Sequence, residues 1–192
     1  YWNPEKPWGH ELVVNTLLEQ GVEYIFTLTG GHIAALLTAA EDKGIKVVGC
    51  HTEEAAVLAA IGYAVQANKV GVACLTAGMT GYAHPAILNA NWGQVPLVIL
   101  NGAAESYASG TRAMQEYDTK SVAKNAEVRE ALRCTVWERI PQMTTWAFKA
   151  ATGTIPGAAY IEYPIDLLCS TGDPEKIKKW TTTVCTARAQ GD

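Results

Sequence analysis

The sequence predicts an α/β fold built on a parallel sheet that is buried on both faces. Short apolar runs rich in β-branched and aromatic residues alternate with segments in which apolar residues recur at helical spacing. The runs are continuously apolar and do not alternate with polar residues, which is typical of strands covered by helices on both sides. Repeated strand and helix patterns of this kind indicate a three-layer arrangement.

The elements follow one another in a regular order. A helical pattern at residues 8–20 ends at Gly21, a residue suited to the left-handed position after a helix. The next apolar run leads through Gly30 and Gly31 into a second helical pattern, and the alternation then continues. Strands are predicted at residues 24–28, 45–50, 70–76, 96–100 and 158–163, and helices at residues 8–20, 33–40, 53–68, 82–92 and 140–151.

Two segments lack a periodic pattern. Residues 101–127 carry glycine and serine but few bulky apolar residues, and loops of this length are usually functional or mobile. After Pro164, residues 170–192 lose periodicity and gain threonine, lysine and glycine. We therefore predict one domain over residues 1–168 and a linker-like tail over residues 169–192.

Composition and charge exclude several classes of protein. The chain has 192 residues, of which 48% are hydrophobic and 18% charged, so it has ample material for one core and is not intrinsically disordered. A net charge of −4 without a run of Lys or Arg argues against nucleic acid and anionic membrane surfaces as partners. No signal-peptide pattern and no apolar run of membrane-spanning length, about 20 residues, is visible.

The cysteines point to a reducing compartment. The five cysteines are scattered, form no C-x-x-C pair and are odd in number, which fits neither a disulfide framework nor a zinc site. We expect reduced, mostly buried thiols in a cytoplasmic protein.

Residues at the strand ends are the candidates for function, because open α/β sheets bind ligands beyond the carboxyl ends of their strands. These ends carry Gly30-Gly31-His32, His51-Thr52-Glu53-Glu54 and the run from Thr76 to Gly81. Neither a P-loop nor a dinucleotide fingerprint is present, and tight turns without a ligand remain an alternative. The spacing of His, Cys and Asp matches no zinc or calcium site, and no G-x-S-x-G elbow occurs.

Glu53 is the most informative of these residues. It opens a helix so rich in alanine that several of its sides must be buried, which places the carboxylate in a medium of low dielectric. The alternative is a first-turn carboxylate that merely interacts favourably with the helix dipole, and Glu54 suits that interpretation better.

Several motifs in register resemble one family. They are GVEYIF at residues 21–26, GGH at residues 30–32, EEAAVLAAIGYA at residues 53–64, PLVILNG at residues 96–102, QEYD at residues 115–118 and PGAAYIEYPID at residues 156–166. Together they resemble the pyrimidine-binding (PYR) domain of thiamine-diphosphate-dependent enzymes of the acetolactate synthase, benzaldehyde lyase and 2-hydroxyacyl-CoA lyase type. The resemblance covers most of the chain and implies a three-layer fold with a six-stranded, mostly parallel sheet and helices on both faces.

The resemblance implies catalytic roles for three residues. The family glutamate at the position of Glu53 hydrogen-bonds N1′ of the aminopyrimidine and favours the imino tautomer, whose nitrogen removes the C2 proton of the thiazolium. This contact needs a carboxyl group that can share a proton near neutral pH, and burial in an alanine-rich helix works in that direction. His32 aligns with a histidine that shuttles protons near the reacting carbonyl, and Gln115 with a loop glutamine that reaches a neighbouring subunit's substrate pocket. A backbone-bound helix-start histidine and a solvated loop glutamine are the alternatives.

The cofactor-binding positions implied by the family are Gly30, Gly31, Glu53, Thr76 and Gly78. Three departures affect this edge. His51-Thr52 stands where most members have Arg-His, Thr29 replaces a proline, and Gly78-Met79-Thr80-Gly81 replaces a Gly-Pro-Gly turn. These changes leave the type of substrate open.

The family binds the diphosphate through Mg²⁺ held by a second domain, marked by Gly-Asp-Gly and a later Asn-Asn. The chain shows neither motif and no metal-ligand set of its own, so we expect a diphosphate-binding domain or subunit as partner. In the family each cofactor lies between domains of two subunits, so the resemblance also implies a homo-oligomer, a dimer or tetramer, and a small-molecule substrate. The chain is then either a natural split subunit or the first domain of a longer polypeptide, and the linker-like tail favours the latter.

Two functions follow from the sequence. The first is the aminopyrimidine-binding half of a thiamine-diphosphate-dependent carboligase, lyase or decarboxylase that acts on a 2-oxo acid or a 2-hydroxyacyl compound. The alternative is a non-catalytic α/β module of the same fold, used for oligomer contact or regulation.

Overall fold

A single parallel sheet forms the centre of the protein, whose computed structural model describes residues 6–180. Its six strands are ordered β2-β1-β3-β4-β6-β5, and every neighbouring pair is parallel. The strands are β1 (Tyr24–Thr27), β2 (Lys46–Gly49), β3 (Gly71–Leu75), β4 (Leu97–Ala103), β5 (Glu130–Arg133) and β6 (Ala158–Pro164). The predicted α/β class and buried parallel sheet are confirmed.

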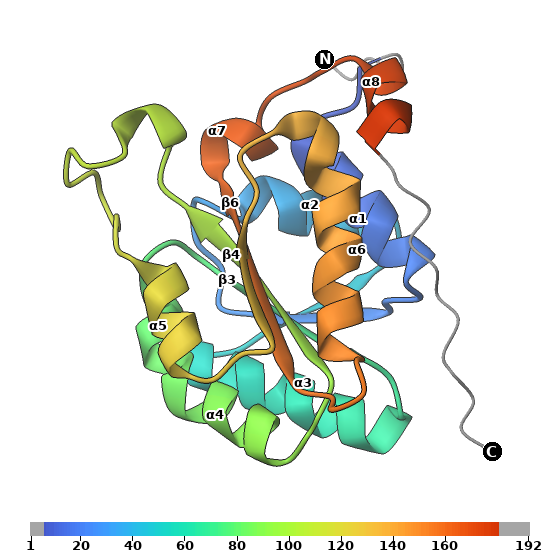
Figure 1. Ribbon diagram of the computed structural model, residues 1–192, viewed down its shortest axis with the longest axis vertical. Coiled ribbons are helices and arrows are strands. Elements are labelled where there is room, and N and C mark those ends of the chain that lie inside the picture. Colours follow the sequence, from blue (N-terminus) through green and yellow to red (C-terminus); the bar gives the residue numbers. More distant parts are fainter. Residues whose placement is uncertain (1–5, 181–192) are drawn as a thin grey trace.

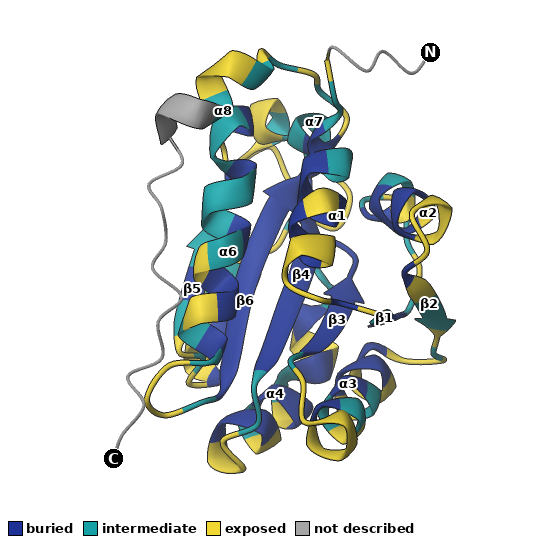
Figure 2. Cartoon of the chain, turned by 90° about the vertical axis from the view of Figure 1, so that its right-hand side faces the viewer, coloured by how far each residue is buried: buried dark blue, intermediate teal, exposed yellow. Residues whose placement is uncertain are grey.

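Helices cover both faces of the sheet, as Figures 1 and 2 show. Helices α1, α2 and α6 bury their apolar side chains in one core cluster, and α3, α4 and α5 do so in a second cluster on the other face. The helices are α1 (Gly9–Glu19), α2 (Ala34–Asp42), α3 (Glu53–Ala67), α4 (His84–Trp92), α5 (Thr119–Asn125) and α6 (Ile140–Ala151).

The two core clusters explain why the central strands are continuously apolar. In β4, Val98 and Leu100 point into the cluster with α1, α2 and α6, whereas Leu97 and Ile99 point into the cluster with α3, α4 and α5. Because successive side chains of a strand face opposite sides, a strand covered on both sides needs apolar residues at every position. Figure 2 shows β3, β4 and β6 buried along their length.

The prediction of an irregular stretch over residues 101–127 is wrong at both ends. Strand β4 continues to Ala103, and α5 occupies Thr119–Asn125; β5 then follows as a further strand absent from the sequence prediction. Helix α5 is short and mostly polar. Strand β5 is short and includes two charged residues, because it lies at the edge of the sheet and pairs with β6 alone. One local signal for α5 was present: Asp118 caps the helix by accepting from the backbone N–H of Ser121 at 3.1 Å.

The beginning of the predicted tail lies against the domain. Two short helices follow β6, α7 (Ile165–Leu168) and α8 (Pro174–Trp180), where no helical pattern was predicted. Between them the backbone N–H of Gly9 donates to the Ser170 carbonyl at 2.9 Å, and the Trp137 indole donates to the same carbonyl at 3.1 Å. The domain boundary at residue 168 stays a prediction, and residues 181–192 lie outside the described residues.

The cysteines described by the structure are free thiols. Cys74 and Cys134 are buried, Cys50 is half-buried and Cys169 is exposed, so burial is less general than predicted; Cys185 lies outside the described residues. Burial raises the pKa of Cys134 to about 11, so this thiol stays protonated at neutral pH. Among residues 6–180 no helix has both the length and the apolar character needed to cross a membrane.

The two-sided core makes a direct prediction for stability. Ile99 is fully buried at the centre of β4, and Ile99→Ala should lower the free energy of unfolding by about 2–5 kcal/mol because it removes apolar contacts and leaves a cavity. Ile155 is 57% exposed, and the matched change Ile155→Ala should stay within about 0.5 kcal/mol. Urea unfolding followed by circular dichroism measures both, and equal losses in the two variants would contradict the buried position of β4.

Candidate functional site

The order of the strands reverses direction between β1 and β3. From β1 the chain first moves outward to β2 and then returns to the other side of β1 for β3, so the direction of winding reverses between these two strands. Ligands of open α/β sheets bind at such a reversal, beyond the carboxyl ends of the strands. The Thr27 hydroxyl of β1 donates to the Cys74 carbonyl of β3 at 2.7 Å and links the two strands there.

Gly30 and Thr76 are in contact at this reversal, in the turns that follow β1 and β3. A Cβ on Gly30 would lie 2.4 Å from the Thr76 hydroxyl oxygen and 2.5 Å from the Thr76 Cβ. The space beside Gly30 is therefore taken by Thr76, which is itself buried. This contact joins the turns that follow β1 and β3 and explains why a glycine stands at position 30, whereas Gly31 is exposed and would have room for a side chain.

His32 is held beside this contact. Its Nδ1 lies 3.5 Å from the Thr76 hydroxyl oxygen, at the outer limit of a hydrogen bond, and the imidazole is half-buried. On its other side the backbone of β4 approaches closely, since a Cβ on Gly102 would lie 2.8 Å from the His32 Cβ. His32 thus sits where the ends of β1, β3 and β4 come together.

Glu53 is the first residue of α3 and one of the few buried carboxylates of the protein. The helix begins at this edge of the sheet because Thr52 accepts the Ala55 N–H at 3.0 Å as its N-cap. Helix α3 then crosses β1 and β3, with Ala56, Val57 and Ala60 fully buried. Glu53 is 7% exposed, whereas Glu54 is exposed.

The Glu53 carboxylate has no hydrogen-bond or ion-pair partner among the residues that the structure describes. Glu53 is 7% exposed as a residue, and its carboxylate oxygens keep contact with solvent, since no side-chain oxygen of the described residues is both fully buried and without a partner. An unpartnered carboxylate at the ligand-binding edge is suited to a hydrogen bond with a bound molecule.

Gln115 reaches the same edge from a distant part of the chain. The segment from Ala104 to Asp118, which we call the β4–α5 loop, folds back over the turn that follows β3. A Cβ on Gly78 would lie 2.7 Å from the Gln115 carbonyl oxygen, and Gly78 has a positive φ of 76°, so this position requires glycine for two reasons. The structure therefore brings Gly78 and Gln115 together, and Thr76, Gly30 and His32 together; Glu53 has no direct contact with either group among the described contacts.

The turn that departs from the family pattern is anchored to the sheet. Residues Met79–Ala83 form a 3₁₀ helix, within which Thr80 is fully buried. The Thr80 hydroxyl donates to the Asn101 side-chain oxygen at 2.9 Å, and the Asn101 amide nitrogen donates to the Gly102 carbonyl at 2.7 Å. The altered turn is thus ordered by a hydrogen-bonded link to β4.

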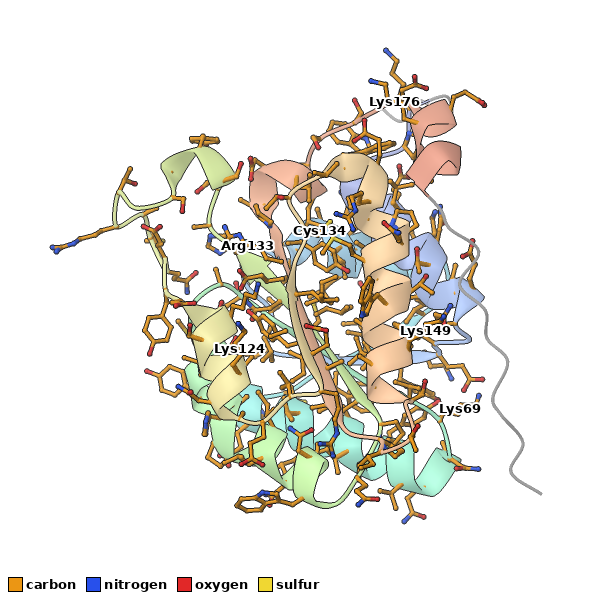
Figure 3. The ribbon with its side chains drawn as sticks, in the orientation of Figure 1. Lys69, Lys124, Arg133, Cys134, Lys149 and Lys176 are labelled. Carbon is orange, nitrogen blue, oxygen red and sulfur yellow. The ribbon has the colours of Figure 1, made fainter. Side chains whose placement is uncertain are left out.

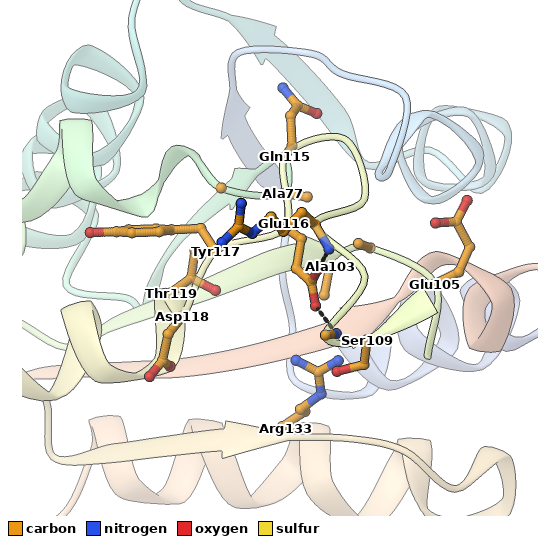
Figure 4. A pocket seen from close by; sticks show the side chains of 14 residues that line it. Ala77, Ala103, Glu105, Ser109, Gln115, Glu116, Tyr117, Asp118, Thr119 and Arg133 are labelled. Carbon is orange, nitrogen blue, oxygen red and sulfur yellow. Dashed lines mark hydrogen bonds between the residues drawn. The ribbon is translucent and has the colours of Figure 1, made fainter. Parts of the chain in front are cut away.

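A cavity of about 480 Å³ lies under the β4–α5 loop, beyond the ends of β4 and β5. Its wall includes Gly78 and Gln115 of the predicted site together with Glu116, Thr119 and Arg133, which sequence analysis did not assign a role (Figure 4). The cavity therefore extends the candidate site from the ends of β1 and β3 toward the ends of β4 and β5.

Buried polar residues form a network at the base of this cavity. Glu162 of β6 is 2% exposed and pairs with Arg133 of β5 at 2.7 Å. Its other carboxylate oxygen accepts from the hydroxyls of Thr119 and Tyr160, each at 2.7 Å. Burial and the nearby Glu162 charge raise the pKa of Tyr160 well above its usual value. The sequence holds one signal for this network, because Glu162 is a charged residue within the otherwise mostly apolar run AAYIEYP.

Removal of Arg133 tests the network. Arg133→Ala removes the ion-pair partner of the buried Glu162, and we expect the free energy of unfolding to fall by roughly 2–3 kcal/mol. This loss is smaller than that expected for a fully buried ion pair, because Arg133 is partly exposed. The control is Lys69→Ala, which breaks an exposed pair with Glu23 and should cost clearly less, because ion pairs in contact with water contribute little to stability. Figure 3 labels both residues, Arg133 beside the strands and Lys69 at the outside of the molecule. Urea unfolding measures the two variants, and a smaller loss for Arg133→Ala than for Lys69→Ala would contradict this assignment.

Comparison with known proteins agrees with the fold. Residues 7–122, more than half of the chain, match the family model described as "Thiamine pyrophosphate enzyme, N-terminal TPP binding domain". The chain is 39% identical over 162 residues to 2-hydroxyacyl-CoA lyase 2 of Danio rerio, an alignment that covers 83% of this chain and 26% of the relative. It is 37% identical to the Homo sapiens protein of the same name over 167 residues, with 83% and 25% covered.

A bacterial relative gives the same result. The chain is 32% identical over 182 residues to the acetolactate synthase isozyme 2 large subunit of Escherichia coli (strain K12), which covers 92% of this chain and 32% of the relative. The chain thus spans between a quarter and a third of the length of these relatives. By its sequence match and its fold, the chain belongs to the thiamine pyrophosphate enzymes, of which it represents the N-terminal TPP-binding domain.

Proposed function

We propose that this domain supplies the aminopyrimidine-binding half of a thiamine-diphosphate site, in an enzyme that breaks or forms carbon–carbon bonds next to a carbonyl group. The substrate class that we propose is a 2-oxo acid or a 2-hydroxyacyl compound, in keeping with the names of the relatives. The observation that carries the proposal is Glu53, a largely buried residue at the carboxyl edge of the sheet whose carboxylate has no hydrogen-bond or ion-pair partner among the described residues.

The residues at this edge suit the aminopyrimidine ring. The ring nitrogen N1′ can share a proton with a carboxyl group, and Glu53 is the buried carboxyl group at the start of α3. Thr76 and Gly78 follow β3, so their backbone groups are available beside the ring, and Gly30 and Gly31 line the opposite turn. When bound, the cofactor supplies a carbon nucleophile for attack on the substrate carbonyl.

We assign proton transfer and substrate contact to two further residues. His32, at the meeting point of β1, β3 and β4, is placed to give or take a proton at a substrate oxygen. Gln115, exposed on the β4–α5 loop, is placed to donate a side-chain hydrogen bond to substrate.

A second domain is needed to complete this site. Among the described residues no group of three or more His, Cys, Asp or Glu side chains could hold a metal ion. We therefore propose that Mg²⁺ and the diphosphate are bound by a diphosphate-binding domain, in the same polypeptide or in another one.

We also propose a cytoplasmic location, which the free cysteines of the described residues support.

Exposed apolar side chains support association with further protein. Leu58 and Val65 of α3, Tyr82 of the 3₁₀ helix and Trp92 of α4 are all exposed, and α3 contacts both of the other elements. Apolar side chains that gather on neighbouring surface elements are typical of protein interfaces. We propose that they contribute to a homo-oligomer.

Replacement of Glu53 tests its role. Glu53→Gln keeps the size of the side chain but cannot exchange a proton, so turnover by the protein completed with its diphosphate-binding domain should fall by about 10²-fold or more. The matched control is Glu54→Gln at the exposed neighbour, which should stay close to wild type. Steady-state kinetics measures the effect, and near wild-type turnover of Glu53→Gln would refute the assignment.

Cofactor binding separates the half-site from a non-catalytic module. Titration calorimetry with thiamine diphosphate and Mg²⁺ should show binding when this chain is mixed with the diphosphate-binding domain and little or none with this chain alone. Glu53→Gln should weaken binding in the mixture, because it removes the proton shared with the ring. The absence of binding in both samples would favour a module used for oligomer contact or regulation.

A further inference from the structure

The Glu116 carboxylate ties together the part of the β4–α5 loop that lies next to Gln115. Glu116 accepts hydrogen bonds from the backbone N–H groups of Gly110 at 2.5 Å, Arg112 at 2.7 Å and Ala113 at 3.2 Å. Arg112 and Ala113 donate to one carboxylate oxygen and Gly110 to the other. The loop around residues 110–116 therefore forms a ring that passes through the Glu116 side chain.

The ring holds backbone conformations that residues with side chains seldom adopt. Arg112 and Gln115 have positive φ angles of 60° and 62°. Such conformations persist where surrounding contacts enforce them. Here Glu116 binds the amide of Arg112 itself, and it directly follows Gln115 in the chain.

The same ring determines where Gln115 lies. The Gln115 carbonyl is in close contact with Gly78, while the Glu116 side chain turns into the loop and the Gln115 side chain points the other way (Figure 4). Gln115 is thus fixed on one side by the contact with Gly78 and on the other by the ring through Glu116.

The electrostatics favour the charged form of Glu116. The hydrogen bond from Gly110 is the largest cause that lowers the pKa of Glu116, with smaller contributions from the other two amides and from Arg133. A charged carboxylate forms stronger hydrogen bonds to backbone amides than a neutral acceptor does.

We propose that Glu116 is a positioning residue, whose carboxylate holds the β4–α5 loop closed and thereby presents Gln115 beside Gly78 at the cofactor-binding edge. The part of this inference that concerns catalysis rests on the proposed function of Gln115. In this proposal Glu116 acts through the backbone of the loop, to which its carboxylate is bound.

Hydrogen exchange tests the loop without any cofactor. In Glu116→Ala the amides of Gly110, Arg112 and Ala113 lose their acceptor, and their exchange should become about tenfold faster or more. Glu116→Gln keeps one acceptor oxygen and should fall between Ala and wild type. The control is Glu105→Ala, because Glu105 lies on the same loop and lines the same cavity but has no side-chain hydrogen bond within the described part of the chain. Unchanged exchange in Glu116→Ala would overturn the proposal.

Activity tests whether Glu116 acts through Gln115. In the protein completed with its diphosphate-binding domain, Glu116→Ala should lower kcat/KM by about tenfold, and it should cause no further loss when Gln115 is already replaced by alanine. Losses that multiply in the double variant would show that Glu116 does not act through Gln115 and would overturn the proposal. A wild-type protein without any dependence on thiamine diphosphate would instead refute the proposed function, and the exchange comparison still decides whether Glu116 holds the loop.

Discussion

The parallel direction of all six strands is the constraint on which the candidate site depends. Parallel strands place every carboxyl end at one edge, so the segments that follow β1, β2, β3 and β4 all emerge there. The winding reverses between β1 and β3, the position at which open α/β sheets bind ligands. Gly30 and Thr76 are in contact there, and α3 begins with Glu53 at the same edge.

The sheet can present these residues only because both of its faces are covered. Helices α1, α2 and α6 on one face and α3, α4 and α5 on the other form two apolar clusters that keep the strands in register. The alanines of α3 allow that helix to lie close to β1 and β3: a Cβ on Gly71 of β3 would lie 2.3 Å from the Ala60 carbonyl oxygen. This close approach holds α3 against the sheet.

The loops of the site are fixed by buried hydrogen bonds and not by apolar contacts. Thr80 and Asn101 connect the turn after β3 to β4, and Glu162 connects β6 to α5 and β5 through Thr119 and Arg133. Each link joins segments that are far apart in the sequence and buries polar groups that must be satisfied. Glu116 forms a local link instead, within residues 110–116 of the exposed β4–α5 loop. The contrast with Glu53, whose carboxylate has no such link among the described residues, is what distinguishes a structural carboxylate from one available to a ligand.

The sequence by itself determined the fold class, the order of the main elements and the family, because apolar periodicity and glycine turns are local properties that can be read along the chain. Strands β1 to β4 and β6 and helices α1 to α4 and α6 fall where these patterns predict them, to within a few residues at their ends. Strand β5 and helix α5 did not emerge from the pattern, since an edge strand and a short polar helix need little apolar surface. Only the tertiary structure decided that Gln115 lies against Gly78, that Thr76 fills the space beside Gly30, and that Arg133, Thr119 and Glu162 meet under the loop. Such contacts depend on strand order and on close backbone approach, which arise only when distant segments fold together.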